Sequence, residues 1–184
     1  MLVLCGKSAA GKNYFLRLLT ELGMRQVVTY TTRPIREGER DEVDYHFIPD
    51  WLFDKLQSDN FFAETSEYQV ANGETWKYGS AVSDYLDDDN SAIILNPEGI
   101  KKIKKQNIPV TIFLLRASEK TRMKRLEDRG DDKDEVIRRM EADDKDFSDI
   151  DYDYICYTDT GVDAKTMAEK IYKIYKKRKS DESL

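Results

Sequence analysis

The chain has 184 residues, of which 40% are hydrophobic and 36% charged, a composition typical of one globular core with a well-solvated surface. Its formal net charge of −6 argues against a broad nucleic-acid-binding surface, which would need a basic excess. No apolar run approaches the length that spans a membrane and no signal-peptide pattern leads the chain, so we expect a cytoplasmic protein without membrane partners.

The first thirteen residues are the most informative stretch. The apolar run 2–5 predicts a buried strand, a glycine-framed loop follows it, and apolar residues recur over 13–22 at the spacing of one helix face. In this context, the G-x-x-x-x-G-K match of residues 6–12 predicts a phosphate-binding loop. Inward-turned backbone N–H groups, the helix N-terminus and the Lys12 ammonium would each attract phosphate. The simplest alternative is a chance Gly-Lys pair in a strand-to-helix turn.

Asn13 stands where Ser or Thr usually supplies a hydroxyl for magnesium. An amide oxygen can still face the ion or one of its waters. Asn13 is therefore the candidate Mg²⁺ contact, and its presence weakens the magnesium prediction more than the phosphate prediction.

The rest of the chain alternates between strand and helix patterns. Further strand candidates lie at 24–28, 91–95, 110–115 and 154–157, and helical patterns at 97–106, 118–128, 133–146 and 162–178. This alternation predicts an α/β fold with a five-stranded parallel sheet flanked by helices. We expect the tail from Lys176 to be frayed. Cys5 and Cys156 lie in apolar strand runs and are expected to be reduced core residues.

Residues 29–83 depart from the alternation and predict an inserted subdomain. The segment is rich in Thr, Tyr and Phe and has period-two stretches at 43–48 and 61–70. A short helix is expected to open at Pro49-Asp50, and the Asn72-Gly73 pair is a strong signal for a hairpin turn. We interpret the segment as a small mixed α+β subdomain.

Four further motifs in consistent order make the chain recognisable. They are Thr29-Tyr-Thr-Thr-Arg-Pro-Ile-Arg-Glu-Gly-Glu39, Asp44-Tyr-His-Phe47, Tyr78-Gly-Ser80 and Arg125-Leu-Glu-Asp-Arg-Gly130. With the phosphate loop ahead of them, the chain resembles the guanylate kinase family over about residues 2 to 175. The resemblance implies a P-loop kinase fold with a core of 1–28, 84–116 and 147–184, an NMP-binding subdomain at 29–83 and a helical lid at 117–146.

The resemblance also implies the reaction, which is ATP-dependent phosphorylation of GMP or dGMP with Mg²⁺. Nucleotides would be the small-molecule partners of a monomer or homodimer. The ATP-binding residues would be Gly6, Lys7, Ser8, Ala9, Ala10, Gly11, Lys12 and Asn13.

The resemblance assigns the phosphate of the monophosphate substrate to Arg33, Arg36, Tyr45 and Tyr78. Guanidinium groups bind phosphate through two parallel hydrogen bonds, so two arginines three positions apart in a Pro-containing loop suit this role. Taken alone, the pair would be interpreted as a solvated surface pair.

By similarity, two lid arginines, Arg129 and Arg139, would act with Lys12 as the catalytic residues, reaching the triphosphate and the transferring phosphoryl. Phosphoryl transfer needs charge neutralisation and positioning rather than a nucleophilic side chain, which suits a basic lid. The spacing from Gly130 to Arg139 is one residue shorter than the family pattern, so Arg138 is an alternative. A solvated basic helix face is the simpler interpretation of any single member.

Guanine presents N–H donors and the acceptor O6, so a carboxylate and hydroxyls complement it. Thr29 matches the O6-side hydroxyl of the family, Ser80 joins it in the substrate site, and Glu64, or else Glu67, would supply the carboxylate. The family follows its third core strand with an acidic run.

In this chain, that acidic run is replaced by Ile94-Leu-Asn-Pro-Glu-Gly99, so Asn96 replaces the acid on the guanine side and Ile94 the upstream one. Asn96 could accept a hydrogen bond from the guanine amine without charge, which leaves base selectivity open.

Two other functions remain as alternatives. A kinase of the same fold could act on another phosphorylated small molecule such as ribose 1,5-bisphosphate. A non-catalytic binding module is disfavoured, because Lys12 and both lid arginines are present. His46 is interpreted as a packing residue, and the acidic runs 87–89 and 131–132 as solvated loop charges.

Overall fold

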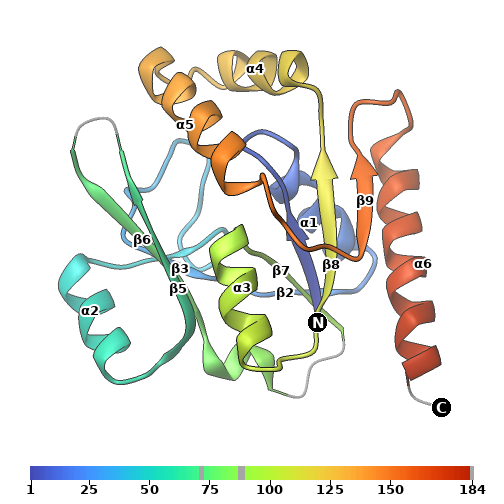
Figure 1. Cartoon of the computed structure of the whole chain (residues 1–184), viewed down its shortest axis with the longest axis horizontal. Coiled ribbons are helices and arrows are strands. Elements are labelled where there is room, and N and C mark those ends of the chain that lie inside the picture. The colour runs from blue at the N-terminus through green and yellow to red at the C-terminus, as the bar shows by residue number, and fades with distance from the viewer. Residues whose placement is uncertain (71–72, 87–89, 183–184) are drawn as a thin grey trace. The chain divides into compact units, whose positions relative to one another are not determined.

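A computed structural model describes residues 1–70, 73–86 and 90–182 of the chain (Figure 1). The chain divides into two compact units. Unit 1 comprises Met1–Gln26, Asp89–Pro97 and Pro109–Leu184, and unit 2 comprises Val27–Asp88 and Glu98–Ile108. The acidic run 87–89 and Asn72 of the predicted hairpin turn lie outside the described residues.

Unit 1 is built on a five-stranded parallel sheet, as the alternation of elements predicts. Its strands lie in the order β2-β7-β1-β8-β9. Their bounds are Leu2–Cys5 for β1, Arg25–Gln26 for β2, Ser91–Ile94 for β7, Thr111–Arg116 for β8 and Tyr154–Tyr157 for β9. All four residues of β1 are buried, because this strand is central. Apolar runs are typical of parallel strands covered on both faces.

Four helices of unit 1 connect or flank these strands. They are α1 (Lys12–Glu21), α4 (Glu119–Asp128), α5 (Lys133–Asp146) and α6 (Ala164–Glu182). The expected frayed tail from Lys176 is wrong, since α6 continues to Glu182. Lys176 Nζ donates to Asn90 Oδ1 at 2.6 Å, and Arg178 forms an ion pair with Asp153. These contacts hold the last turns of α6 against unit 1.

The main core of unit 1 lies where α1 and α6 cover one face of the sheet. Leu2 and Leu4, alternate residues of β1, pack in one cluster with Leu19 of α1 and with Ile171 and Tyr175 of α6. Period-two alternation in a strand and period-3.6 spacing in the helices bring these side chains to one layer. The burial of these side chains is the main contribution to the stability of unit 1, which holds the loop at 6–12.

Both cysteines are free thiols in the described structure, as expected. Cys5 is fully buried in the central strand. Cys156 is only partly buried, contrary to the expectation of a core residue, because β9 is an edge strand.

Unit 2 contains a four-stranded mixed sheet in the order β4-β3-β6-β5. The strands are β3 (Tyr30–Thr31), β4 (His46–Phe47), β5 (Phe62–Gln69) and β6 (Thr75–Ala81), with α2 (Asp50–Ser58) and the 3-10 turn η1 (Val82–Tyr85) alongside. β5 and β6 pair antiparallel, and β3 pairs parallel with β4. The strand expected at 43–48 is much shorter, because only two residues pair with β3.

The helix α3 (Pro97–Lys105) contacts β5 within unit 2. Lys102 Nζ donates to the Thr65 carbonyl, and Gln106 Nε2 donates to the Ala63 carbonyl at 2.6 Å. Residues 98–108 therefore group with unit 2 by their contacts.

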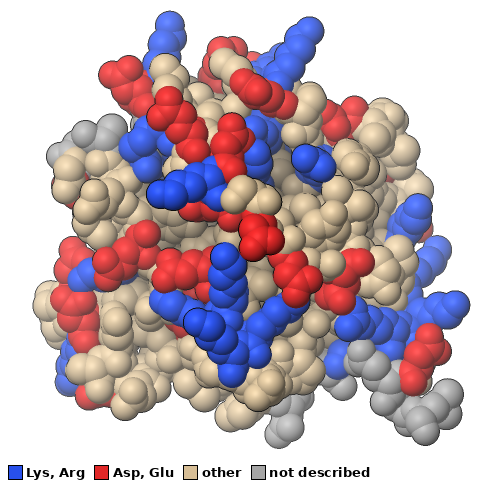
Figure 2. All heavy atoms as spheres, in the orientation of Figure 1, with Lys and Arg blue, Asp and Glu red and all other residues tan. Residues whose placement is uncertain are grey.

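Acidic and basic side chains are interspersed over the molecular face drawn in Figure 2. Among residues 1–70, 73–86 and 90–182, the longest apolar helical stretches fall short of what a membrane crossing requires.

Candidate active site

The loop between β1 and α1 has a backbone that only small residues accommodate. Gly6, Ala9 and Gly11 have positive φ angles of 151°, 58° and 102°. A Cβ on Gly6 would lie 2.4 Å from the carbonyl oxygen of Leu115 in β8, so the loop passes the sheet at a distance that excludes any side chain. A run of such conformations turns successive N–H groups toward one concave side, where an anion can bind.

The Lys12 side chain forms two hydrogen bonds with the backbone at the start of this loop. Its Nζ donates to the carbonyls of Gly6 at 2.6 Å and Lys7 at 3.1 Å. Burial lowers the pKa of the Lys12 ammonium, whereas the Asp143 carboxylate raises it. The ammonium is therefore held beside the loop with backbone oxygens as its neighbours.

The far half of the loop is fixed from two other elements. Arg125 Nη1, on α4, donates to the Ala9 carbonyl at 3.0 Å, and Thr158 Oγ1, after β9, donates to the Ala10 carbonyl at 2.9 Å. Arg125 Nη2 also donates to the Thr158 carbonyl at 3.0 Å. These bonds fix the loop backbone, in which the Ala10 N–H donates to the Lys7 carbonyl at 3.1 Å while the Ser8 N–H points to an acceptor outside the loop.

The acceptor in this structure is a carboxylate from α5. The Ser8 backbone N–H donates to Asp143 Oδ2 at 2.7 Å, and Arg122 Nη1 of α4 contacts the same oxygen at 3.2 Å. Lys7 forms an ion pair with the neighbouring Asp144. Asp143 is only 14% exposed and accepts where a phosphate oxygen would be expected to accept. The sequence patterns did not identify either aspartate, because neither belongs to a recognised motif.

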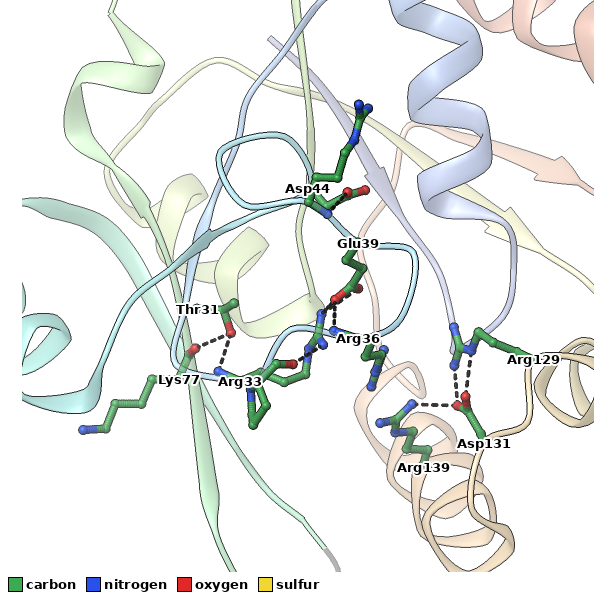
Figure 3. Close-up of polar contacts among 11 residues, drawn as sticks. Thr31, Arg33, Arg36, Glu39, Asp44, Lys77, Arg129, Asp131 and Arg139 are labelled. Carbon is green, nitrogen blue, oxygen red and sulfur yellow. Dashed lines mark hydrogen bonds and ion pairs between the residues drawn. The ribbon is translucent and has the colours of Figure 1, made fainter.

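Asp131 joins the two predicted lid arginines (Figure 3). Arg129 Nε donates to Asp131 Oδ1 at 2.8 Å, and Arg139 Nη1 donates to Asp131 Oδ2 at 3.2 Å. The expectation that Asp131 is a solvated loop charge is wrong, since its side chain is 12% exposed and shared by two cations. The structure brings Arg129 and Arg139 together in this way. The alternative lid arginine, Arg138, lies in the preceding position of α5 and is half-buried.

In unit 2, the Arg33 guanidinium is buried and paired with the Glu39 carboxylate, rather than exposed to solvent (Figure 3). Arg33 is 3% exposed, and its Nη2 donates to both Glu39 oxygens at 2.8 and 3.0 Å. Glu39 also accepts the Arg36 backbone N–H at 2.9 Å. The interpretation as a solvated surface pair is therefore wrong for Arg33. Glu39 closes the quoted motif, yet its position alone did not show that it orders the loop.

Aromatic rings surround the Arg33 guanidinium. Its Cζ lies 5.4 Å from the Tyr45 ring centroid and 5.6 Å from that of Phe47, within the range of cation–π attraction. Tyr78 packs edge-on to Tyr45 with centroids 6.0 Å apart, and burial raises the pKa of Tyr45 to about 12. The predicted phosphate-binding residues Arg33, Tyr45 and Tyr78 thus form one cluster.

Of the two candidate carboxylates, Glu64 is buried and Glu67 is exposed. Ser80 Oγ, on the neighbouring strand, donates to Glu64 Oε1 at 2.7 Å, and its oxygen lies 2.7 Å from the Tyr85 hydroxyl. Burial raises the pKa of Glu64 to about 7, while the Ser80 hydrogen bond and the Lys102 ammonium oppose this rise. Tyr85 had no role in any motif.

The two remaining predicted substrate residues lie in different units. Thr29 is half-buried just before β3, and its carbonyl accepts the His46 N–H at 2.9 Å. Asn96 follows β7 in unit 1 by two residues. It lies at the same carboxyl edge of the sheet as the loop after β1, since these strands are parallel neighbours. The His46 ring lies 4.5 Å from that of Tyr30, as a packing residue would.

In the described residues, no group of three or more His, Cys, Asp and Glu side chains could hold a metal ion. Asn13 is exposed in the first turn of α1, next to Lys12. An amide oxygen beside a phosphate loop fits Mg²⁺ that is carried mainly by phosphates and waters, which is the usual way proteins bind this ion with nucleotides.

Comparison with known proteins agrees with this geometry. The family model for guanylate kinase matches residues 1–174. The guanylate kinase of Hydrogenovibrio crunogenus is 35% identical over 159 residues, which cover 82% of this chain and 76% of that protein. That of Sulfurimonas denitrificans is 32% identical over 174 residues, covering 86% and 80%.

The crystal structure of guanylate kinase from Anaplasma phagocytophilum has the same fold. It superposes with a TM-score of 0.67 at 22% identity and covers 97% of this chain and 85% of that one. The residues matched by the family model include the loop at 6–12, Arg33 and Arg36 of unit 2, and the lid arginines Arg129 and Arg139. The chain therefore belongs to the guanylate kinase family.

Proposed function

We propose that this protein transfers the terminal phosphoryl group of ATP to GMP or dGMP. The observation that carries the proposal is the loop at 6–12, whose carbonyls are tied back while the Ser8 N–H already binds an anionic oxygen. A backbone fixed in this way can bind a phosphate oxygen in the place of the carboxylate, and preorganised N–H groups of this kind stabilise transferring phosphoryl groups.

On the ATP side, Gly6 to Asn13 would cradle the phosphates, and Lys12 would exchange its carbonyl partners for phosphate oxygens. Arg129 and Arg139 would neutralise the charge that develops on the transferring phosphoryl. Their shared partner Asp131 holds them together beforehand. Asn13 would contact Mg²⁺ or one of its waters, and the ion supplies charge neutralisation and alignment of the phosphates.

On the GMP side, Arg33 and Arg36 with Tyr45 and Tyr78 would bind the phosphate. Arg33 is oriented by Glu39 and by the Pro34 carbonyl, and would donate the N–H groups that these partners leave to the phosphate. The residues proposed to contact the base are Thr29, Glu64, Ser80 and Asn96. Glu64 is favoured over Glu67 as the base-reading carboxylate because it is buried and ordered by Ser80.

The predicted division of labour remains part of the proposal. Residues 1–28, 84–116 and 147–184 would form the core, 29–83 the NMP-binding subdomain and 117–146 the lid. A lid that excludes water protects ATP from hydrolysis in such enzymes. A cytoplasmic location and a monomer or homodimer are proposed with it.

A coupled assay with ATP and a panel of acceptors tests the function. GMP and dGMP should exceed AMP, UMP, CMP and ribose 1,5-bisphosphate in kcat/KM, because a buried carboxylate opposite adenine would lack donors. Glu64→Gln should raise the KM for GMP, whereas the matched control Glu67→Gln should not. A higher rate with ribose 1,5-bisphosphate than with GMP would reject the proposal.

A further inference from the structure

Glu64, Ser80 and Tyr85 form a chain of hydrogen bonds inside unit 2. Ser80 Oγ lies 2.7 Å from Glu64 Oε1 and 2.7 Å from Tyr85 Oη, so the serine oxygen connects the carboxylate to the phenol. Ser80 is fully buried and Glu64 nearly so. Polar groups this deep are normally satisfied by fixed partners, and here each is the partner of the next.

The position of Tyr85 is set by its own turn. Asp84 Oδ2 accepts the Ala81 N–H at 2.9 Å, and the Val82 N–H donates to the Phe61 carbonyl at 2.9 Å. These bonds fix the 3-10 turn η1 directly after β6, and its last residue, Tyr85, lies five residues beyond Ser80. Burial raises the pKa of the Tyr85 hydroxyl, which therefore keeps its proton at neutral pH.

Counting protons gives the direction of the chain. In the ionised form of Glu64, which prevails above its pKa of about 7, the carboxylate only accepts, so the single proton of Ser80 is directed to Glu64. The Tyr85 hydroxyl must then donate to the Ser80 oxygen, since that oxygen has no second proton to give. The order of donation is Tyr85 to Ser80 to Glu64.

We propose that Tyr85 is a positioning residue of the base site, because its donation to Ser80 holds the serine oxygen and favours donation by the serine hydroxyl. This rests on the proposed GMP kinase function. When guanine binds, its N1–H and amine can satisfy Glu64. The Ser80 proton is then released to the guanine O6, while Tyr85 continues to occupy a lone pair of the serine oxygen.

The same arrangement rejects adenine. Adenine has no N1–H and presents an amine at the place of O6, so Glu64 gains no donor at N1 and Ser80 keeps its proton directed to Glu64. A buried carboxylate that faces a base without donors is a strong basis for discrimination, and Tyr85 contributes by holding Ser80 and Glu64 in the arrangement that guanine completes.

Charges from α3 act on Glu64, and a charge from η1 acts on Tyr85. The Lys102 ammonium lowers the pKa of Glu64, while the Glu98 carboxylate raises it. Asp84 acts on Tyr85, whose pKa it raises further. Loss of the Tyr85 hydroxyl would weaken the Ser80 donation to Glu64, because linked hydrogen bonds polarise one another. The carboxylate would then ionise at a higher pH.

Tyr85→Phe keeps the ring and removes only the hydroxyl. We expect the KM for GMP to rise about two- to tenfold, the size of one neutral hydrogen bond, with kcat and the KM for ATP within about twofold of wild type. The preference for GMP over AMP should fall by a similar factor. The pH profile of kcat/KM for GMP should move to higher pH, since this profile reports groups of the free enzyme. Tyr157→Phe, at an exposed tyrosine, is the matched control.

A double-mutant cycle separates positioning from packing. In a Ser80→Ala background, Tyr85→Phe should have no further effect on the KM for GMP, since its route through Ser80 is gone. An equal effect in both backgrounds, or an unshifted pH profile with unchanged KM in Tyr85→Phe, would overturn the inference. Thermal unfolding and direct GMP titration of each variant show whether it is folded. Failure of the proposed function is distinguishable from failure of this inference, because the wild-type protein would then not prefer GMP in the acceptor panel.

Discussion

Asp143→Asn should make the protein bind ATP more tightly. In the structure, the Asp143 carboxylate accepts the Ser8 N–H at 2.7 Å and contacts Arg122 at 3.2 Å. An incoming phosphate must displace it from the loop before it can take the same N–H. The amide oxygen of asparagine still fits the position, but it competes less strongly because it carries no charge.

The size of the effect follows from the bond that phosphate must break. A hydrogen bond to a charged acceptor contributes about 1.5–3 kcal/mol, and a neutral one about 0.5–1.5 kcal/mol. The difference of about 1 kcal/mol corresponds to roughly a fivefold decrease in Kd. Asp143→Ala would be less informative, because it would also remove the hydrogen-bond acceptor of the buried Arg122, which asparagine keeps.

Isothermal titration of ATP without GMP measures this affinity without turnover. The control is Asp146→Asn, which makes the same change in net charge at an exposed position of α5. A Kd for Asp143→Asn equal to that of Asp146→Asn would show that the carboxylate does not compete with phosphate. Weaker binding would place Asp143 among the groups that hold ATP.

Three further outcomes are expected. Lys12→Ala should fold normally, by thermal unfolding, and lose at least about two orders of magnitude in kcat, the scale for one preorganised stabilising group. Near-normal turnover would reject the role of this lysine. Gly6→Ala should lower the unfolding free energy by about 1–3 kcal/mol and weaken ATP binding, because its Cβ would lie 2.4 Å from the Leu115 carbonyl oxygen. Gly23→Ala, with positive φ but no atom within 4 Å, should keep ATP binding unchanged. Glu64 has a pKa raised to about 7, so the folded state binds the extra proton and loses stability as pH rises from about 4.5 to 7. Glu64→Gln should therefore be more stable than wild type at pH 8, by about 3 kcal/mol at most, and not at pH 5. Urea unfolding at both pH values measures this, and an equal difference at both would contradict it.

The sequence predicts the strands and helices of unit 1 well, because the patterns that indicate these elements are local. The runs 2–5 and 154–157 coincide with β1 and β9, since a short continuous apolar run bounded by polar residues is typical of a strand in a parallel sheet. The strand expected at 24–28 shortens to Arg25–Gln26, because pairing with β7 determines its length. Partner strands far along the chain are not visible in a local pattern.

The candidate site was predicted from its motif residues but not from their partners. Glu39 and Asp131 order arginines that the motifs identify, and Asp143 reaches the loop from 135 residues away. Such contacts depend on how α5 packs, which no short pattern encodes. Tyr85 is likewise visible only through its distance to Ser80.

The carboxylates of Asp131 and Asp143 are internal counter-ions for groups that are expected to bind phosphate. A bare cluster of cations collects anions from solution, so its affinity for substrate falls steeply as ionic strength rises. Here the competing anions are part of the polypeptide, and their effective concentration at the arginines does not change with salt. ATP affinity should therefore depend only weakly on ionic strength, and the wild-type protein should keep its nucleotide saturation across a wide range of salt concentrations.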